Sequence, residues 1–107
     1  MTPSNPSQIR LLLWDYITRE IRLPAASKSI LLALANLTDP RSRTAHAPIS
    51  LLVVYAGLSQ SDVSRLLGNL DANQWIETNR IPADPGRPPI TVYNLSSQLI
   101  QLALRQS

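Results

Sequence analysis

The sequence predicts a small, mainly α-helical fold of the α+β class, in which a β-hairpin accompanies several helices. Apolar residues recur at helical spacing in four stretches between residues 9 and 72, and again after residue 97. Between residues 75 and 95 they alternate with period two, around a proline-rich connector. The 107 residues, 44% of them hydrophobic, suffice for one core. We therefore expect a flexible arm over residues 1–8 and a single domain over residues 9–107.

The composition argues against several classes of function. The chain has no cysteine, which removes disulfides, thiolate nucleophiles and cysteine metal sites. One histidine and seven scattered carboxylates form no catalytic group, so we expect no enzyme, cofactor or metal ion. The chain has no apolar run near the roughly 20 residues that span a bilayer and no signal-peptide pattern, which predicts a cytoplasmic protein without membrane contact.

The charge favours a polyanionic partner without requiring one. The formal net charge is +3, and Lys28 is the only lysine among ten basic residues. Arginine guanidinium groups bind phosphates or base edges through two parallel hydrogen bonds.

The first helix is predicted over residues 9–21. Its apolar stripe consists of Ile9, Leu12, Leu13, Tyr16, Ile17 and Ile21. Leu11 and Trp14 widen this stripe beyond what one helix on a small core requires, which favours a partner surface. Trp14 and Trp75 lie in apolar-patterned elements, so we expect both to pack rather than to stack on a ligand.

The next helix is predicted to begin at an N-cap, Ser27, and to run through the middle of the fold, because Ser29 to Leu37 is nearly all apolar. Thr38-Asp39-Pro40 ends it, and the polar connection over residues 41–48 is expected to end in a short strand.

A helix-turn-helix is predicted over about residues 50–72. Ser50 is expected to cap a helix that ends at Ala56, where Gly57 allows the chain to turn. Ser59 and Asp62 have the spacing of a capping box and open a helix that reaches about Ala72. Its predicted buried stripe is Val63, Leu66, Leu67 and Leu70.

A hairpin and a last helix complete the chain. Strands are predicted over residues 75–81 and 91–95, and the connector PADPGRPP is too rich in proline to extend them. Ser96 is expected to cap a helix over residues 97–105. This order of elements is that of a winged helix-turn-helix with extra N- and C-terminal helices, with the wing at about residues 75–95.

The run GLSQSDVSRLLGNLDANQWIE resembles the turn, recognition helix and first wing strand of MarR-type bacterial regulators. With SKSILLALANLTDP before it, the chain also resembles the winged-helix domains of plasmid and phage replication initiators. Both resemblances cover roughly residues 27–95. They imply homodimeric binding to double-stranded DNA, with the helix after Gly57 in the major groove and the wing beside it.

The exposed face of that helix is expected to read bases. It comprises Gln60, Ser61, Ser64, Arg65, Gly68 and Asn69. Arg65 can donate twice to guanine, and Gln60 or Asn69 can pair with adenine. The alternative is an ordinary solvated helix face; the hairpin that follows favours the DNA interpretation.

The recognition helix cannot supply the attraction to phosphate, because Asp62 and Asp71 outweigh Arg65. The backbone and wing contacts are therefore assigned to Arg41, Arg43, Ser59, Arg80 and Arg87. Pro85-Gly86-Arg87-Pro88 resembles part of an AT-hook core, although a rigid turn with an incidental arginine has equal weight. We assign His46 no role, since a single loop histidine is more often neither a phosphate contact nor a pH sensor.

A homodimer is predicted through the first and last helices, whose leucine-rich stripes exceed what one small core covers. The interface residues would be Leu12, Leu13, Tyr16, Leu99 and Leu102. The alternative is that these helices pack together within one chain. The predicted protein is a small transcriptional regulator with no small-molecule ligand. A replication-initiator module and a winged helix used for protein contact remain the alternatives.

Overall fold

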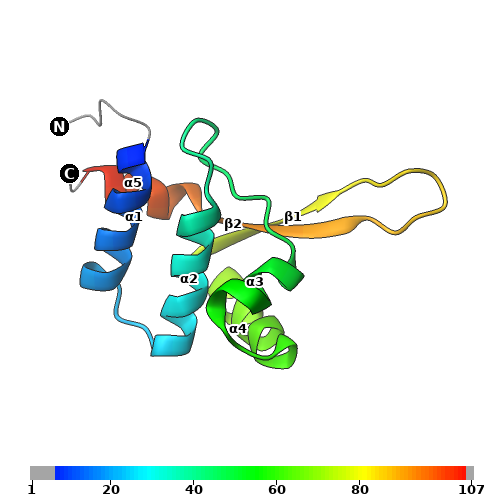
Figure 1. Cartoon of the computed structure of the whole chain (residues 1–107), viewed down its shortest axis with the longest axis horizontal. Coiled ribbons are helices and arrows are strands. Elements are labelled where there is room, and N and C mark those ends of the chain that lie inside the picture. The colour runs from blue at the N-terminus through cyan, green and yellow to red at the C-terminus, as the bar shows by residue number, and fades with distance from the viewer. Residues whose placement is uncertain (1–6, 106–107) are drawn as a thin grey trace.

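The structure, a computed structural model, describes the chain from residue 7 to residue 105. This part forms five helices and one antiparallel hairpin, which places it in the α+β class (Figure 1). The elements are α1 (Ser7–Glu20), α2 (Ala25–Leu37), α3 (Ile49–Ala56), α4 (Gln60–Ala72), β1 (Ile76–Ile81), β2 (Ile90–Leu95) and α5 (Ser97–Arg105). Residues 1–6 of the expected arm lie outside the described residues, and residues 7 and 8 already belong to α1.

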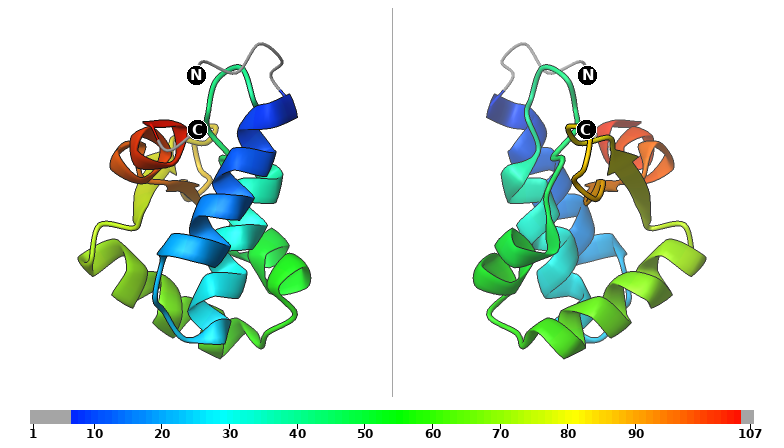
Figure 2. Two further views of the ribbon diagram at one scale, coloured as in Figure 1. Left: turned by 90° about the vertical axis from the view of Figure 1, so that its left-hand side faces the viewer. Right: turned by 90° about the vertical axis from the view of Figure 1, so that its right-hand side faces the viewer.

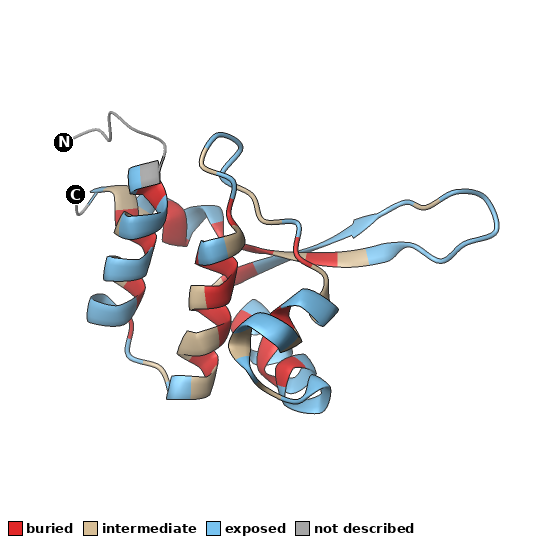
Figure 3. Cartoon of the chain, in the orientation of Figure 1, coloured by how far each residue is buried: buried red, intermediate tan, exposed pale blue. Residues whose placement is uncertain are grey.

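Helix α2 lies at the centre of the fold. It packs against α1, α3, α4 and β2. Ile30, Leu31 and Leu34 have no exposed surface, and the buried part of the chain gathers around this helix (Figure 3). The nearly continuous apolar sequence of α2 follows from this position, since a helix that packs against four other elements buries most of its surface. The predicted central helix is confirmed.

Two predicted N-caps are wrong. Helix α2 begins at Ala25 and α3 at Ile49, each directly after a proline that stands at the N-cap position. The proline ring fixes φ at a value that suits the start of a helix. Its carbonyl accepts the first helical hydrogen bond, as when the Lys28 N–H donates to the Pro24 carbonyl at 3.0 Å. Ser27 and Ser50 therefore lie inside their helices.

The other two predicted caps are confirmed. The Ser59 hydroxyl accepts from the backbone N–H of Asp62 at 3.2 Å, at the start of α4. The Ser96 hydroxyl accepts from Leu99 N–H at 3.1 Å, at the start of α5. Gly57 ends α3 with φ of +69°, the left-handed conformation that glycine adopts without strain.

The hairpin is a two-stranded ladder that projects from the helices (Figure 1). Its register runs from Ile76 opposite Leu95 to Ile81 opposite Ile90. At the tip, Arg87 N–H donates to the carbonyl of Asp84 at 3.0 Å across Pro85 and Gly86, where Gly86 has φ of +89°. Proline and glycine at these two positions are typical of a type II turn. The short strand expected before α3 is reduced to a single bridge between Ala47 and Tyr93.

The assignment of Leu13 and Leu99 to a dimer interface is wrong. Helix α1 packs against α5 of the same chain, and these leucines are 0% and 1% exposed in the core that results. Leu12, Tyr16 and Leu102 are half-buried beside them. The stripes of the two terminal helices thus cover each other within one chain.

Trp14 also departs from the prediction, because it does not lie in the core. It is 46% exposed, and Leu11 one turn before it is 67% exposed. Trp75 is half-buried and packs against the core, as expected. Between residues 7 and 105, no helix is both long and apolar enough to cross a membrane.

A buried amide fixes the connection between α2 and α3. The Oδ1 atom of Asn94 on β2 accepts from the backbone N–H groups of Ala45 and His46, at 2.6 and 2.8 Å. Asn94 is 3% exposed, so water cannot replace these bonds. Arg43 and His46 have positive φ, a conformation rarely adopted by residues other than glycine. The Asn94 amide holds His46 in this conformation, and the Arg43 N–H donates instead to the carbonyl of Asp39 at 2.7 Å.

We expect Asn94→Ala to lower the free energy of unfolding by about 1–3 kcal/mol, because two part-buried hydrogen bonds to the loop backbone are lost. Urea denaturation measures this change, with Asn79→Ala on the exposed part of β1 as the control. A loss under about 0.5 kcal/mol, the usual range for surface substitutions, would contradict the role given to Asn94.

Candidate functional site

One face of α4 is polar and open to solvent. All six residues predicted for this face are exposed: Gln60, Ser61, Ser64, Arg65, Gly68 and Asn69. The opposite stripe of Val63, Leu66, Leu67 and Leu70 is buried, as predicted. The structure therefore brings together the side chains assigned to base reading.

The turn after α4 sets the direction in which the hairpin leaves. Trp75 N–H donates to the carbonyl of Leu70 at 2.9 Å and Gln74 N–H to that of Asp71 at 3.1 Å, with Gln74 at φ of +64°. This pair of bonds around a left-handed residue is a Schellman motif. It joins α4 to β1 without a flexible linker, so the polar face and the hairpin keep a fixed relation.

Arg65 is the one basic residue of α4, and it pairs with Asp62 one turn earlier. The distance from Nη2 to Oδ1 is 3.5 Å, and both side chains are more than half exposed. An exposed pair of this kind contributes about 0–1 kcal/mol. Arg65 can therefore exchange Asp62 for a ligand at little cost.

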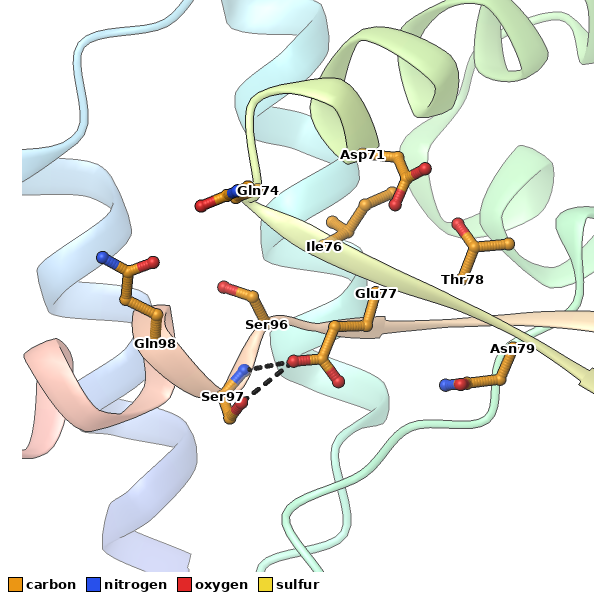
Figure 4. Close-up of a pocket in the computed structure, with 9 residues that line it drawn as sticks. All are labelled: Asp71, Gln74, Ile76, Glu77, Thr78, Asn79, Ser96, Ser97 and Gln98. Carbon is orange, nitrogen blue, oxygen red and sulfur yellow. Dashed lines mark hydrogen bonds between the residues drawn. The ribbon is translucent and has the colours of Figure 1, made fainter.

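The hairpin presents Arg80 and Arg87, both exposed. Its own Glu77 is engaged elsewhere: the carboxylate accepts from the backbone N–H and the hydroxyl of Ser97, at 2.8 and 2.9 Å (Figure 4). A carboxylate at this position is favourable because the N-terminus of α5 carries partial positive charge. Glu77 is thus directed toward α5.

The sequence pattern does not reveal this contact. Glu77 and Ser97 are 20 residues apart, and their meeting depends on how α5 folds back onto the end of the hairpin. A polar hollow surrounds the contact, lined by residues of α4, β1 and α5 and by Gln74, including Asp71 and Glu77 (Figure 4). This acidic hollow is unsuited to phosphate.

The structure separates Arg41 and Arg43 from α4. Their loop and α4 lie at opposite ends of the molecule in all three views (Figures 1 and 2). Arg43 lines a hollow together with Glu77, Ser97 and Gln101, on the side of α5. The two arginines therefore do not lie beside the polar face of α4, because the Asn94 amide on β2 binds the backbone of their loop at Ala45 and His46.

The same loop is tightened by Asp39. Its carboxylate accepts from Arg41 N–H and from the Ser42 hydroxyl, both at 3.2 Å. The backbone bond from Arg41 is the main reason that the pKa of Asp39 lies below its usual value. The backbone N–H of Arg41 is thus held within the loop by Asp39.

The residues between 7 and 105 contain no group of three histidine, cysteine or carboxylate side chains that could hold a metal ion. The chain matches no protein-family model, no curated protein and no solved structure. The resemblances to MarR-type regulators and to replication initiators therefore stay predictions.

We expect Ser59→Ala to lower the free energy of unfolding by about 1 kcal/mol, because Asp62 N–H loses its side-chain acceptor at the start of α4. Thermal and urea denaturation measure this loss. Ser64→Ala on the same exposed face, away from the helix end, is the control. Equal losses in both variants would show that the cap contributes nothing specific.

Proposed function

We propose that the chain binds double-stranded DNA as a winged helix-turn-helix, with α4 in the major groove and the hairpin as the wing. The observation that carries this proposal is the polar face of α4, followed without a linker by a projecting hairpin with two exposed arginines. The face is the right kind for a groove, since it combines one guanidinium, two amides and hydroxyls on a single side of a helix. The proposed role is that of a small transcriptional regulator.

Base reading would rest on three side chains of α4. Arg65 donates to the O6 and N7 atoms of guanine, and Gln60 or Asn69 forms two hydrogen bonds with adenine. Ser61 and Ser64 accept from or donate to base edges and phosphates. The capped N-terminus of α4 enters first, where the helix dipole favours an anion.

The electrostatic attraction of one chain to the DNA phosphates would be modest. With Arg43 on the side of α5, the arginines left to contact phosphate on this surface are Arg80 and Arg87. Each phosphate contact contributes about 0.9 to the slope of log affinity against log salt. One chain therefore gives a shallow salt dependence, and a second chain would double it.

We expect Arg65→Ala to weaken binding to a selected duplex by about 1–3 kcal/mol while leaving random duplexes unchanged, because Arg65 reads a base. Fluorescence anisotropy with duplexes enriched from a random pool measures the difference. An equal loss on selected and random duplexes would remove the base-reading role. Failure to enrich any duplex at low salt would contradict the proposed function itself.

We expect Arg87→Ala to weaken all sequences together and to reduce the salt slope by about 1, because a wing arginine at the backbone carries no sequence information. The same anisotropy assay in a salt series measures the slope. Arg43→Ala is the matched control, since that arginine lies on the side of α5. A change of slope in Arg43→Ala as large as in Arg87→Ala would contradict the surface assigned here.

A further inference from the structure

Strand β1 has one edge that no other strand covers in the part of the chain that the structure describes. The outer edge of β2 is different, because Ala47 bonds to Tyr93 there in both directions, at 3.1 and 2.8 Å. An open edge presents a row of backbone N–H and C=O groups to which another extended chain can bond. The sequence of β1, IETNRI, contains no proline, so each of its residues keeps its N–H group.

The ladder shows which backbone groups of β1 point to this open edge. The Ser96 N–H donates to the Trp75 carbonyl at 3.0 Å, so these two residues form a hydrogen-bonded pair next to the first pair of the ladder. Hydrogen-bonded pairs alternate along an antiparallel ladder with pairs whose N–H and C=O groups point outward. The outward groups of Tyr93, which bond to Ala47, agree with this alternation. The residues of β1 whose backbone groups point to the open edge are therefore Ile76, Thr78 and Arg80.

The acidic hollow beside α5 runs along this edge. Residues 76–79 all line it, although neighbouring side chains of a strand point to opposite faces, so the hollow includes the edge itself rather than one face alone. In Figure 4, Asp71 of α4 lies on the same side of β1 as Thr78. Ser97 of α5 lies on the other side, with Glu77. An extended segment in this hollow would therefore meet the backbone of β1 between α4 and α5.

The charge of the hollow determines which kind of segment fits it. Its described lining includes two carboxylates, Asp71 and Glu77, and no basic residue. Asp71 is exposed, and Glu77 contacts the neutral Ser97 through Oε2 alone, which leaves its Oε1 atom open to a further donor. The whole chain carries a formal charge of +3, so a basic segment would be attracted by this hollow and not by the net charge. Opposite charges across neighbouring strands stabilise their pairing.

We propose that β1 accepts a third strand from another protein, namely an extended segment with two basic residues an odd number of positions apart. Odd spacing directs one basic side chain toward Asp71 and the other toward Glu77, because consecutive residues of a strand point to opposite faces. Backbone hydrogen bonds to the open edge supply affinity for any extended segment, and the two charges supply the preference for a basic one. This inference does not depend on the proposed binding of DNA.

The test uses the full chain without DNA and a fluorescent peptide of about eight residues, a usual strand length, in which threonine and valine alternate around two central lysines. Fluorescence anisotropy measures the dissociation constant. Replacing both lysines by glutamates should raise it at least about tenfold, because two attractive charge pairs become repulsive. Failure of the lysine peptide to bind, or equal binding of the glutamate peptide, would overturn the proposal.

Asp71→Asn should raise the dissociation constant of the lysine peptide about two- to fivefold, because one of the two charge pairs is lost. Asp84→Asn is the matched control, since Asp84 is exposed near the hairpin tip and does not line the hollow. Circular dichroism verifies that both variants are folded. An unchanged constant in Asp71→Asn, or an equal change in Asp84→Asn, would place the peptide elsewhere and overturn the proposal.

Methyl groups on the peptide backbone distinguish strand addition from attraction between charges alone. A lysine peptide that is methylated on every second backbone nitrogen keeps the N–H groups of one edge, and it should still bind. The same number of methyl groups on consecutive central residues blocks both edges, and this peptide should bind at least about tenfold more weakly. Equal affinity of the two methylated peptides would contradict a third strand. Because no DNA is present, these results are independent of the proposed function.

Discussion

The burial of α2 is the interaction on which the rest of the structure depends. Its apolar side chains form the common surface against which α1, α3, α4 and β2 pack, and Ile30, Leu31 and Leu34 have no exposed area. Truncating one buried leucine or isoleucine to alanine costs about 2–5 kcal/mol, a large fraction of the stability of a small domain. Because the chain has no cysteine, the stability of the fold depends on this packing rather than on the disulfides that stabilise other small proteins.

Around that core, a few local polar contacts decide where the functional surfaces point. The Schellman motif at Gln74 directs the hairpin away from α4, and the Glu77 carboxylate fixes the start of α5 against the base of the hairpin. Asn94 draws the loop before α3 toward β2. The hairpin thus leaves α4 in a fixed direction, and the loop before α3 is held against β2.

The sequence predicted those features that are set by neighbouring residues. Periodicity located the helices and strands, and Ser59 and Ser96 were identified as caps because a cap and its N–H partner lie three residues apart. The predictions of Ser27 and Ser50 as N-caps were wrong, because a proline shortly before each serine takes the N-cap position. The residues next to a serine do not show which of two possible helix start positions gives the better packing.

Features that depend on distant contacts could not be predicted. In the sequence, the leucine stripes of α1 and α5 are typical of an interface between chains. In the structure, the two helices pack against each other within one chain. The loop that contains Arg43 is held toward β2 by Asn94, 48 residues after His46 in the sequence, and no local pattern reveals this contact. The six residues assigned to the polar face of α4 are all exposed, as predicted, because a buried stripe on a helix also determines its opposite face.

If the chain binds DNA as proposed, the duplex contacts α4 and the hairpin rather than another surface. Titration of the isotope-labelled protein with an enriched duplex, followed by amide NMR shifts, tests it most directly. We expect shifts for Gln60, Ser61, Arg65 and the hairpin tip over residues 82–89, with the loop over residues 39–46 and α5 unaffected. Shifts confined to that loop and α5, with α4 unchanged, would contradict it.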